Sequence, residues 1–120
     1  MTDSTYVDGF VCAVANQNKQ AYIDYAKKFG TIFREYGALE VVDCWGDDVP
    51  EGKLTSFTMA VKREPDESIA YGWITWPSRG VRDEAWGKMQ TDARFQPEQH
   101  QMPFDGKRMI FGGFQIVNRA

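Results

Sequence analysis

The chain has 120 residues, a formal net charge of −3 and a pI near 5.1, which excludes the clustered basic surface of nucleic-acid-binding proteins. Its 42% hydrophobic and 26% charged residues are typical of a globular protein, and no stretch approaches the roughly 18 apolar residues of a membrane span. Because the start MTDSTYVDGF lacks the basic and apolar regions of a signal peptide, we expect a cytoplasmic protein with no membrane partner.

The first two elements are predicted to be a strand and a long helix. Residues 5–14 (TYVDGFVCAV) are rich in the β-branched and aromatic types that favour strands. From Tyr22 to Tyr36, aromatic and apolar residues recur every three or four positions, which is the pattern of an amphipathic helix. We expect Asn18 to cap this helix and Gly37 to end it.

The middle of the chain contains two further strands with an ambiguous segment between them. Residues 39–47 are predicted to form the second strand and residues 68–76 the third, which Pro77 ends. Apolar and polar side chains alternate over residues 54–62 as they would in a strand, but the same residues also suit a short helix after a cap at Thr55. We favour the helix.

The last third of the chain is predicted to hold a helix, a long loop and a strand. Ser78 is a suitable N-cap for a helix that fades near Thr91. A polar loop over residues 92–107 then leads into the last strand, residues 108–118. Gly112–Gly113 lies inside that strand and is expected to mark a bulge or a close backbone approach at an interface.

The order of the predicted elements indicates a fold. Without the short helix, the order is βαββαβ, which is the pattern of a ferredoxin-like sandwich. We therefore expect an α+β fold in which residues 1–120 form a single ferredoxin-like domain, with both helices on one face of an antiparallel sheet.

The third strand is apolar on both of its faces. Tyr71 and Trp73 alternate with Ala70, Ile74 and Trp76, and the last strand shows the same property. A chain this short cannot cover both faces of its sheet with two helices, so the pattern predicts a homodimer that forms through the open sheet face. An alternative remains open, in which the segment around the short helix and the long loop fold over that face.

Several segments of the chain resemble those of one protein family. They are YVDGFVCAV, NKQAY, VVDCWGDDVPEGK, WITWPS and MPFDGKRMIFGGF, and together they resemble the YbaA-like family of small bacterial proteins of unknown function. The resemblance implies the dimeric α+β barrel superfamily, which includes cofactor-independent oxygenases as well as binding and sensing modules. One departure is visible, because this chain has Asp92-Ala93-Arg94 where the family pattern has Asp-Pro-Arg.

The stretch CWGDDVPEGK, residues 44–53, concentrates carboxylates after the second strand. Asp47, Asp48 and Glu51 offer the oxygen ligands that hard cations take, but they lack the regular alternation of a calcium loop, and the stretch lacks the His of a zinc site. Asp and Gly at a strand end, followed by Pro, are also what a turn requires. We favour the turn and expect no metal.

A pocket is the third interpretation of this stretch. Trp45, with Trp73 or Trp76, would form its aromatic wall, and Asp47 or Asp48 would supply its polar group. Such a pocket, placed between the sheet and the helices, would bind a small hydrophobic or aromatic metabolite. The sequence shows no cofactor motif, so the alternative is a cofactor-independent enzyme, which the resemblance would make monooxygenase-like.

Two basic residues form a second candidate site. Lys107 and Arg108 follow an Asp-Gly turn and could hold an anionic substrate, and the enzyme hypothesis places Arg108 beside Trp45 and Asp47. A salt bridge between the basic pair and the carboxylates at Asp47 and Asp48 is the interpretation that we favour.

The remaining reactive side chains are expected to have ordinary roles. Arg79, Arg82 and Asp83 begin the second helix and are predicted to form a solvated face. The two cysteines, at positions 12 and 44, lie in apolar runs and are predicted to be buried thiols. A single histidine, His100, cannot support a catalytic triad by any spacing argument.

Overall fold

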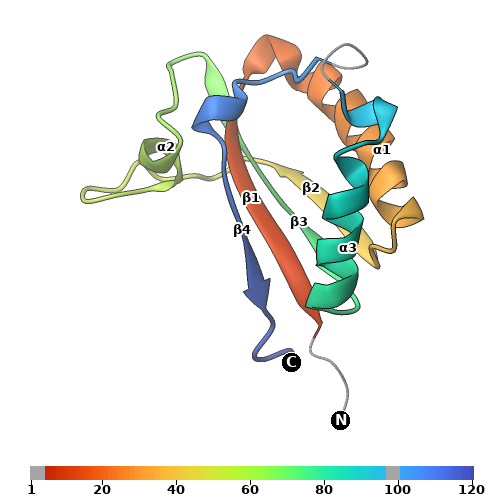
Figure 1. The fold of residues 1–120 in the computed structure, drawn as a ribbon. Coiled ribbons are helices and arrows are strands. Elements are labelled where there is room, and N and C mark those ends of the chain that lie inside the picture. The colour runs from red at the N-terminus through yellow and green to blue at the C-terminus, as the bar shows by residue number, and fades with distance from the viewer. Residues whose placement is uncertain (1–4, 97–100) are drawn as a thin grey trace.

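The computed structural model describes residues 5–96 and 101–120 and shows one four-stranded sheet with two long helices (Figure 1). The elements are β1 (Tyr6–Ala15), α1 (Lys19–Glu35), β2 (Glu40–Trp45), α2 (Phe57–Ala60), β3 (Glu67–Trp76), α3 (Arg79–Met89) and β4 (Ile110–Gln115). Short 3₁₀ turns cover Asn16–Asn18, Ala93–Phe95 and Gly106–Arg108. No helix in the described part of the chain is long and apolar enough to cross a membrane.

The sheet has the strand order β2-β3-β1-β4, and every neighbouring pair is antiparallel. Helices α1 and α3 lie on one side of it, and the segment that carries α2 lies on the other (Figure 1). This is the ferredoxin-like βαββαβ arrangement, so the predicted α+β fold class is confirmed.

Strand register assigns each side chain to one of two faces. In the central pair, Val11 lies opposite Tyr71 and Gly9 opposite Trp73, and at the edge Val7 lies opposite Phe114. Because side chains alternate along a strand, these residues share the face turned away from α1 and α3, which we call the open face. The other face carries the main core, with Trp76 fully buried.

The segment between β2 and β3, residues 46–66, covers one end of the open face. Val61 is fully buried there against Val11 and Ile69. Beside it, the ring of Phe57 on α2 lies 6.0 Å from the ring of Tyr71. The alternative in which this segment folds over the open face is therefore right for one end of it, and the middle of the face stays uncovered.

The long loop turns the other way, toward the helices. Phe104 lies 6.0 Å from the ring of Tyr22 on α1, measured between ring centroids. The amide of Asn18 donates to the carbonyl of Pro103 at 3.4 Å, so the predicted cap of α1 holds the loop and makes no side-chain cap bond. The loop therefore helps to close the core between α1 and the sheet.

Local signals for the helix ends proved mostly accurate. Ser78 Oγ caps α3, and Gly37 has a φ of +109°, a conformation that favours glycine at a helix end. The short helix α2 is confirmed, but its cap is Ser56 and not the predicted Thr55. A side-chain oxygen at either position could serve, and Ser56 is the residue whose extended backbone directly precedes the helix and whose side chain accepts from Met59 N.

The two glycines of β4 do not form a bulge. Gly112 and Gly113 pair in unbroken register with Gly9 and Asp8 of β1, so the predicted bulge is wrong. A Cβ atom at Gly113 would collide with the hydroxyl of Tyr6 on the helix-covered face. The close approach is therefore real, but it occurs inside the chain and away from the open face.

Candidate functional site

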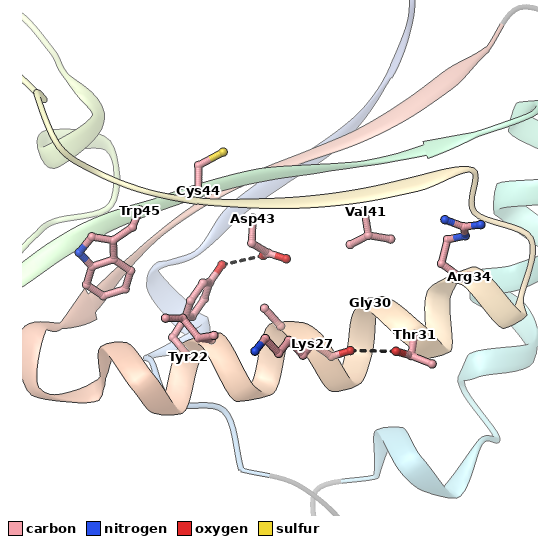
Figure 2. Close-up of a pocket in the computed structure, with 11 residues that line it drawn as sticks. Tyr22, Lys27, Gly30, Thr31, Arg34, Val41, Asp43, Cys44 and Trp45 are labelled. Carbon is pink, nitrogen blue, oxygen red and sulfur yellow. Dashed lines mark hydrogen bonds between the residues drawn. The ribbon is translucent and has the colours of Figure 1, made fainter.

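A groove of about 460 Å³ opens between α1 and β2 on the helix-covered side of the sheet (Figure 2). Strand β2 supplies one wall and α1 supplies the other. The lining residues are Tyr22, Ile23, Ala26, Lys27, Gly30, Thr31, Arg34, Val41, Asp43, Cys44 and Trp45.

The groove exists because small residues of α1 face larger side chains of β2. Alternation along the strand points Val41, Asp43 and Trp45 toward α1 (Figure 2). Facing them, Ala26 and Gly30 leave space that longer side chains would fill. An added Cβ at Gly30 would lie 3.7 Å from a methyl group of Val41, an ordinary contact distance.

A tyrosine and a carboxylate meet at the centre of the groove. The hydroxyl of buried Tyr22 donates to Asp43 Oδ1 at 2.9 Å (Figure 2). Burial raises the pKa of Tyr22, so this hydroxyl remains a donor at neutral pH. Desolvation raises the pKa of Asp43, and the hydrogen bond from Tyr22 opposes that shift. Asp43 Oδ2 accepts no hydrogen bond from the residues that the structure describes, so it is available to a ligand.

The aromatic rings of the groove lie at one end, and two cationic side chains that line it lie along α1. Trp45 lies 5.9 Å from the ring of Tyr22, and outside the lining Lys19 Nζ lies 5.5 Å from the centroid of the Trp45 ring. Figure 2 shows Arg34 at the end far from Trp45, with Lys27 between them on α1. The groove thus has an aromatic end, a central carboxylate and a basic end.

The three tryptophans proposed to share a pocket do not meet. Trp45 lines the groove, whereas Trp73 lies on the open face on the other side of the sheet. Trp76 is fully buried, and its indole N–H donates to Asp8. Of these three tryptophans, only Trp45 therefore lines the groove, together with the ring of Tyr22.

The carboxylates after β2 lie outside the groove. Asp47 and Asp48 are exposed in a bend, and Gly46 N donates to the carbonyl of Ile69 at 2.7 Å just before them. Within residues 5–96 and 101–120, no group of three metal-ligating side chains could hold an ion. The carboxylate that enters the groove is Asp43, two positions before Trp45 on the same strand face.

The basic pair near β4 has a different neighbourhood from the predicted one. Arg108 forms a bidentate pair with Glu67, with both N–O distances at 2.8 Å, and an ion pair with Asp105 at 3.1 Å. It also donates to the carbonyl of Lys62, while Lys107 is exposed. The predicted salt bridge with the carboxylates after β2 is therefore wrong for Arg108. Instead, Arg108 joins the segment of residues 46–66 to the sheet.

A buried polar cluster beneath α3 was not anticipated from the sequence. The carboxylate of Asp8, 7% exposed, accepts hydrogen bonds from the indoles of Trp76 and Trp86 and from Arg82. The predicted solvated face is wrong for Arg82, whose side chain is 21% exposed. A carboxylate in the middle of an apolar strand was the available signal, since a buried carboxylate must find donors.

Neither thiol of the chain is directed into the groove. Cys12 is buried as predicted, and burial raises the pKa of its thiol to about 12, which makes it unreactive at neutral pH. Cys44 is exposed, so the prediction of a second buried thiol is wrong, and its side chain points away from α1 (Figure 2). His100 lies outside the described residues.

The open face forms a second, larger concave surface of about 770 Å³. Tyr71, Ile110 and Phe114 are 45%, 46% and 58% exposed on it, and Trp73 is half-buried. An exposed apolar surface of this kind is typical of a protein–protein interface.

Sequence relatives of this chain are uncharacterised. It is 52% identical over 112 residues to the "Uncharacterized protein YbaA" of Escherichia coli K12, covering 93% of this chain and 96% of that protein. The same identity and coverage are found for the proteins of the same description from Escherichia coli O157:H7 and Shigella flexneri.

Two further comparisons address the fold and the family. A solved structure described as a dimeric ferredoxin-like protein from an uncultured marine organism matches with a TM-score of 0.64, covering 98% of this chain and all of that one, at 9% sequence identity. This likeness supports the ferredoxin-like fold. Residues 5–106 match the family described as "Protein of unknown function (DUF1428)". The chain therefore belongs to the DUF1428 family.

Proposed function

We propose that this protein is a homodimer that binds a small hydrophobic or aromatic metabolite in the groove between α1 and β2. The observation that carries this proposal is the Tyr22–Asp43 pair, which places a free carboxylate oxygen at the centre of a mainly apolar groove. Ligand sites are typically lined by apolar and aromatic side chains with a few polar groups that orient the ligand. The groove volume of about 460 Å³ suits a molecule of one or two rings.

The homodimer part of the proposal rests on the open face. Away from the end that residues 46–66 cover, Ile110 and Phe114 are exposed among the described residues, and a second copy of the same face would bury them around a two-fold axis. The structural neighbour with the same fold is described as dimeric.

A cofactor-independent enzyme is a second candidate, favoured by one observation. Asp43 has a raised pKa and an oxygen that receives no hydrogen bond from the described residues, which are properties of a general base. The enzyme would transfer a proton from a bound substrate to Asp43. An Asp43→Asn variant that still binds the ligand but converts none of it would support this candidate, and equal turnover by the variant would contradict it.

Filling the groove tests ligand binding. Gly30 and Gly87 are both glycines inside helices, but only Gly30 lines the groove, and an added Cβ at Gly87 has no neighbour within 4 Å. Gly30→Leu should abolish binding of indole and naphthol probes in ligand-observed NMR, whereas Gly87→Leu should bind them as the wild type does. Equal binding by both variants would place the ligand elsewhere, and no binding by the wild type would contradict the proposal.

A charged substitution on the open face tests the dimer. Phe114 on the open face and Leu39 outside it are 58% and 51% exposed, so neither substitution disturbs a buried core. We expect native mass spectrometry to show a dimer for the wild type and for Leu39→Lys, and mainly monomer for Phe114→Lys. A wild-type monomer, or a Phe114→Lys variant that remains dimeric, would contradict an interface on this face.

A further inference from the structure

We infer that the ligand of the groove is an aromatic carboxylic acid, whose ring system lies against Trp45 and Tyr22 and whose carboxylate pairs with Arg34, with a weaker attraction from Lys27. This inference rests on the proposed function and adds the chemical class and the orientation of the ligand.

Arg34 differs from most other arginines of this protein. Within the described residues, every arginine except Arg34 and Arg119 has a carboxylate within 4.0 Å. Lys27 forms no ion pair with any described residue either, but this is true of every lysine except Lys88. In an acidic protein, with a net charge of −3, carboxylates are plentiful, yet Arg34 beside the groove pairs with none of the described ones. An anionic ligand would supply the missing partner, and a guanidinium is suited to hold a carboxylate by two parallel hydrogen bonds.

The two cations lie along the same edge of the groove. They are seven positions apart on α1, which is about two helical turns or roughly 10 Å. Both line the groove. At roughly 10 Å, Lys27 lies just beyond the screening length of about 8 Å in physiological salt, so an acid bound at Arg34 is held mainly by Arg34 and only weakly attracted by Lys27.

The central carboxylate fixes the orientation. A ligand carboxylate beside Asp43 would be repelled toward one end of the groove. Arg34 lines the groove at the end far from Trp45 (Figure 2), whereas Lys19, at the Trp45 end, lies over the Trp45 ring and is not a lining residue, so the Arg34 end is the better site for the carboxylate. The rings then lie toward Trp45 and Tyr22, whose own rings are 5.9 Å apart. Asp43 Oδ2 would accept a hydrogen bond from an N–H or O–H group in the middle of the ligand. From Val41 to Trp45, the strand wall runs about 13 Å, which is long enough for a two-ring acid.

Arg34 also lies in the last turn of α1, where a positive charge interacts favourably with the helix dipole. That role predicts a small change in stability on removal of the charge and no change in the preference for an anionic ligand. A binding measurement therefore distinguishes the ligand-binding role of Arg34 from its role at the helix end, whereas a melting curve does not.

The test compares indole-3-propionate with indole-3-propionamide, which has nearly the same shape and no charge, by isothermal titration calorimetry. The wild type should bind the acid at least about tenfold more tightly than the amide, the factor expected from a charge-assisted pair. Arg34→Gln with Lys27→Gln should remove this preference and leave the affinity for the amide unchanged. Arg34→Lys should retain part of it, because the charge remains and the two parallel hydrogen bonds are lost.

Lys28→Gln is the matched control. Lys28 is the exposed neighbour of Lys27, and its Nζ lies over the ring of Phe29, outside the groove. It should keep the full preference for the acid, and a loss equal to that of the groove variants would overturn the inference. Equal binding of acid and amide by the wild type would overturn the inference alone. If neither compound binds to the wild type, the proposed function fails with it.

Discussion

Arg82 of α3 holds Asp8 of β1 by two nitrogens, with Nη2 2.8 Å and Nε 3.1 Å from Oδ1 of the carboxylate. The side chains are 21% and 10% exposed, and the residues are 74 positions apart in the sequence. The indole N–H groups of Trp76 and Trp86 donate to Oδ2 of the same carboxylate at 2.9 and 3.0 Å. A single carboxylate thus joins α3 to two strands of the sheet.

Asp8→Asn should lower the free energy of unfolding by about 2–4 kcal/mol, because it leaves the guanidinium of Arg82 partly buried without a charged partner. Urea denaturation measures the loss. Asp83→Asn is the control, since Asp83 also pairs with Arg82 but is 50% exposed, and its loss should be below about 0.5 kcal/mol. Equal effects of the two substitutions would show that burial of the Asp8 pair is not the cause.

Gly113→Ala should cost about 1–3 kcal/mol, because the new Cβ would collide with the Tyr6 hydroxyl and lie 2.9 Å from Nη2 of Arg82. At Gly112, the nearest atom to a new Cβ is a ring carbon of Phe114 at 3.4 Å, so Gly112→Ala should be nearly neutral. Thermal unfolding of both variants measures the difference. A neutral Gly113→Ala would mean that Tyr6 and Arg82 can move aside without cost.

Ala93→Pro should stabilise the protein by about 0.4–1 kcal/mol by restricting the unfolded chain. Ala93 is the first residue of a 3₁₀ turn, a conformation whose typical φ of about −50 to −70° is close to that of proline, and Asp92 before it is extended as proline requires. The melting temperature should rise. A lower melting temperature would show that the turn cannot accept the ring, although the Asp92 cap and its bond from Arg94 N are in place.

The protein should lose stability as the pH falls below about 5. Hydrogen bonds from Arg94 lower the pKa of Asp92, and those from Arg108 lower the pKa of Glu67. A carboxylate with a lowered folded-state pKa contributes fully above its unfolded pKa, near 4, and that contribution disappears as the pH falls through the folded value. The raised pKa of Asp43 acts in the opposite direction and offsets part of the loss.

Glu67→Gln tests the pH argument at one site. The variant should be less stable than the wild type at pH 7, because Arg108 loses a bidentate partner, and the difference should shrink toward pH 3 as Glu67 becomes protonated. Denaturant midpoints at both pH values measure this. A difference that is constant with pH would show that the ionised form of Glu67 is not what stabilises the fold.

The sequence predicted best the features that depend on nearby residues. Ser78 caps an amide three positions ahead, and Gly37 ends α1 by its own backbone conformation, so both could be recognised without the fold. The partners of Asp8 are 68 to 78 positions away, and no local pattern names them. Helix ends depend on residues that are close in the sequence, whereas buried polar clusters join residues that are far apart in it.

The candidate site was predicted only in part, for a related reason. Trp45 was predicted, but Asp43 was not, although alternation in β2 places it on the same face as Trp45 and could have indicated it. Which face of the sheet the helices cover could not be decided in advance, because β3 is apolar on both sides, and Trp73 and Trp76 therefore looked equivalent. The groove itself depends on the small side chains of Ala26 and Gly30, which indicate a gap only once a wall stands opposite them.

The strand order also sets the sequence of events during synthesis. Strand β1 is the first to leave the ribosome and pairs with β3 and β4, so its second neighbour is made only at the end of the chain. Until Ile110–Gln115 emerge, β1 is an unprotected edge, and edges of this kind recruit other extended chains. Arg108 is also translated late. Its hydrogen bond to Lys62 and its ion pair with Glu67, which join residues 46–66 to the sheet, therefore form at the same stage. A nascent chain that stops before β4 therefore carries its most apolar strand as an aggregation-prone edge.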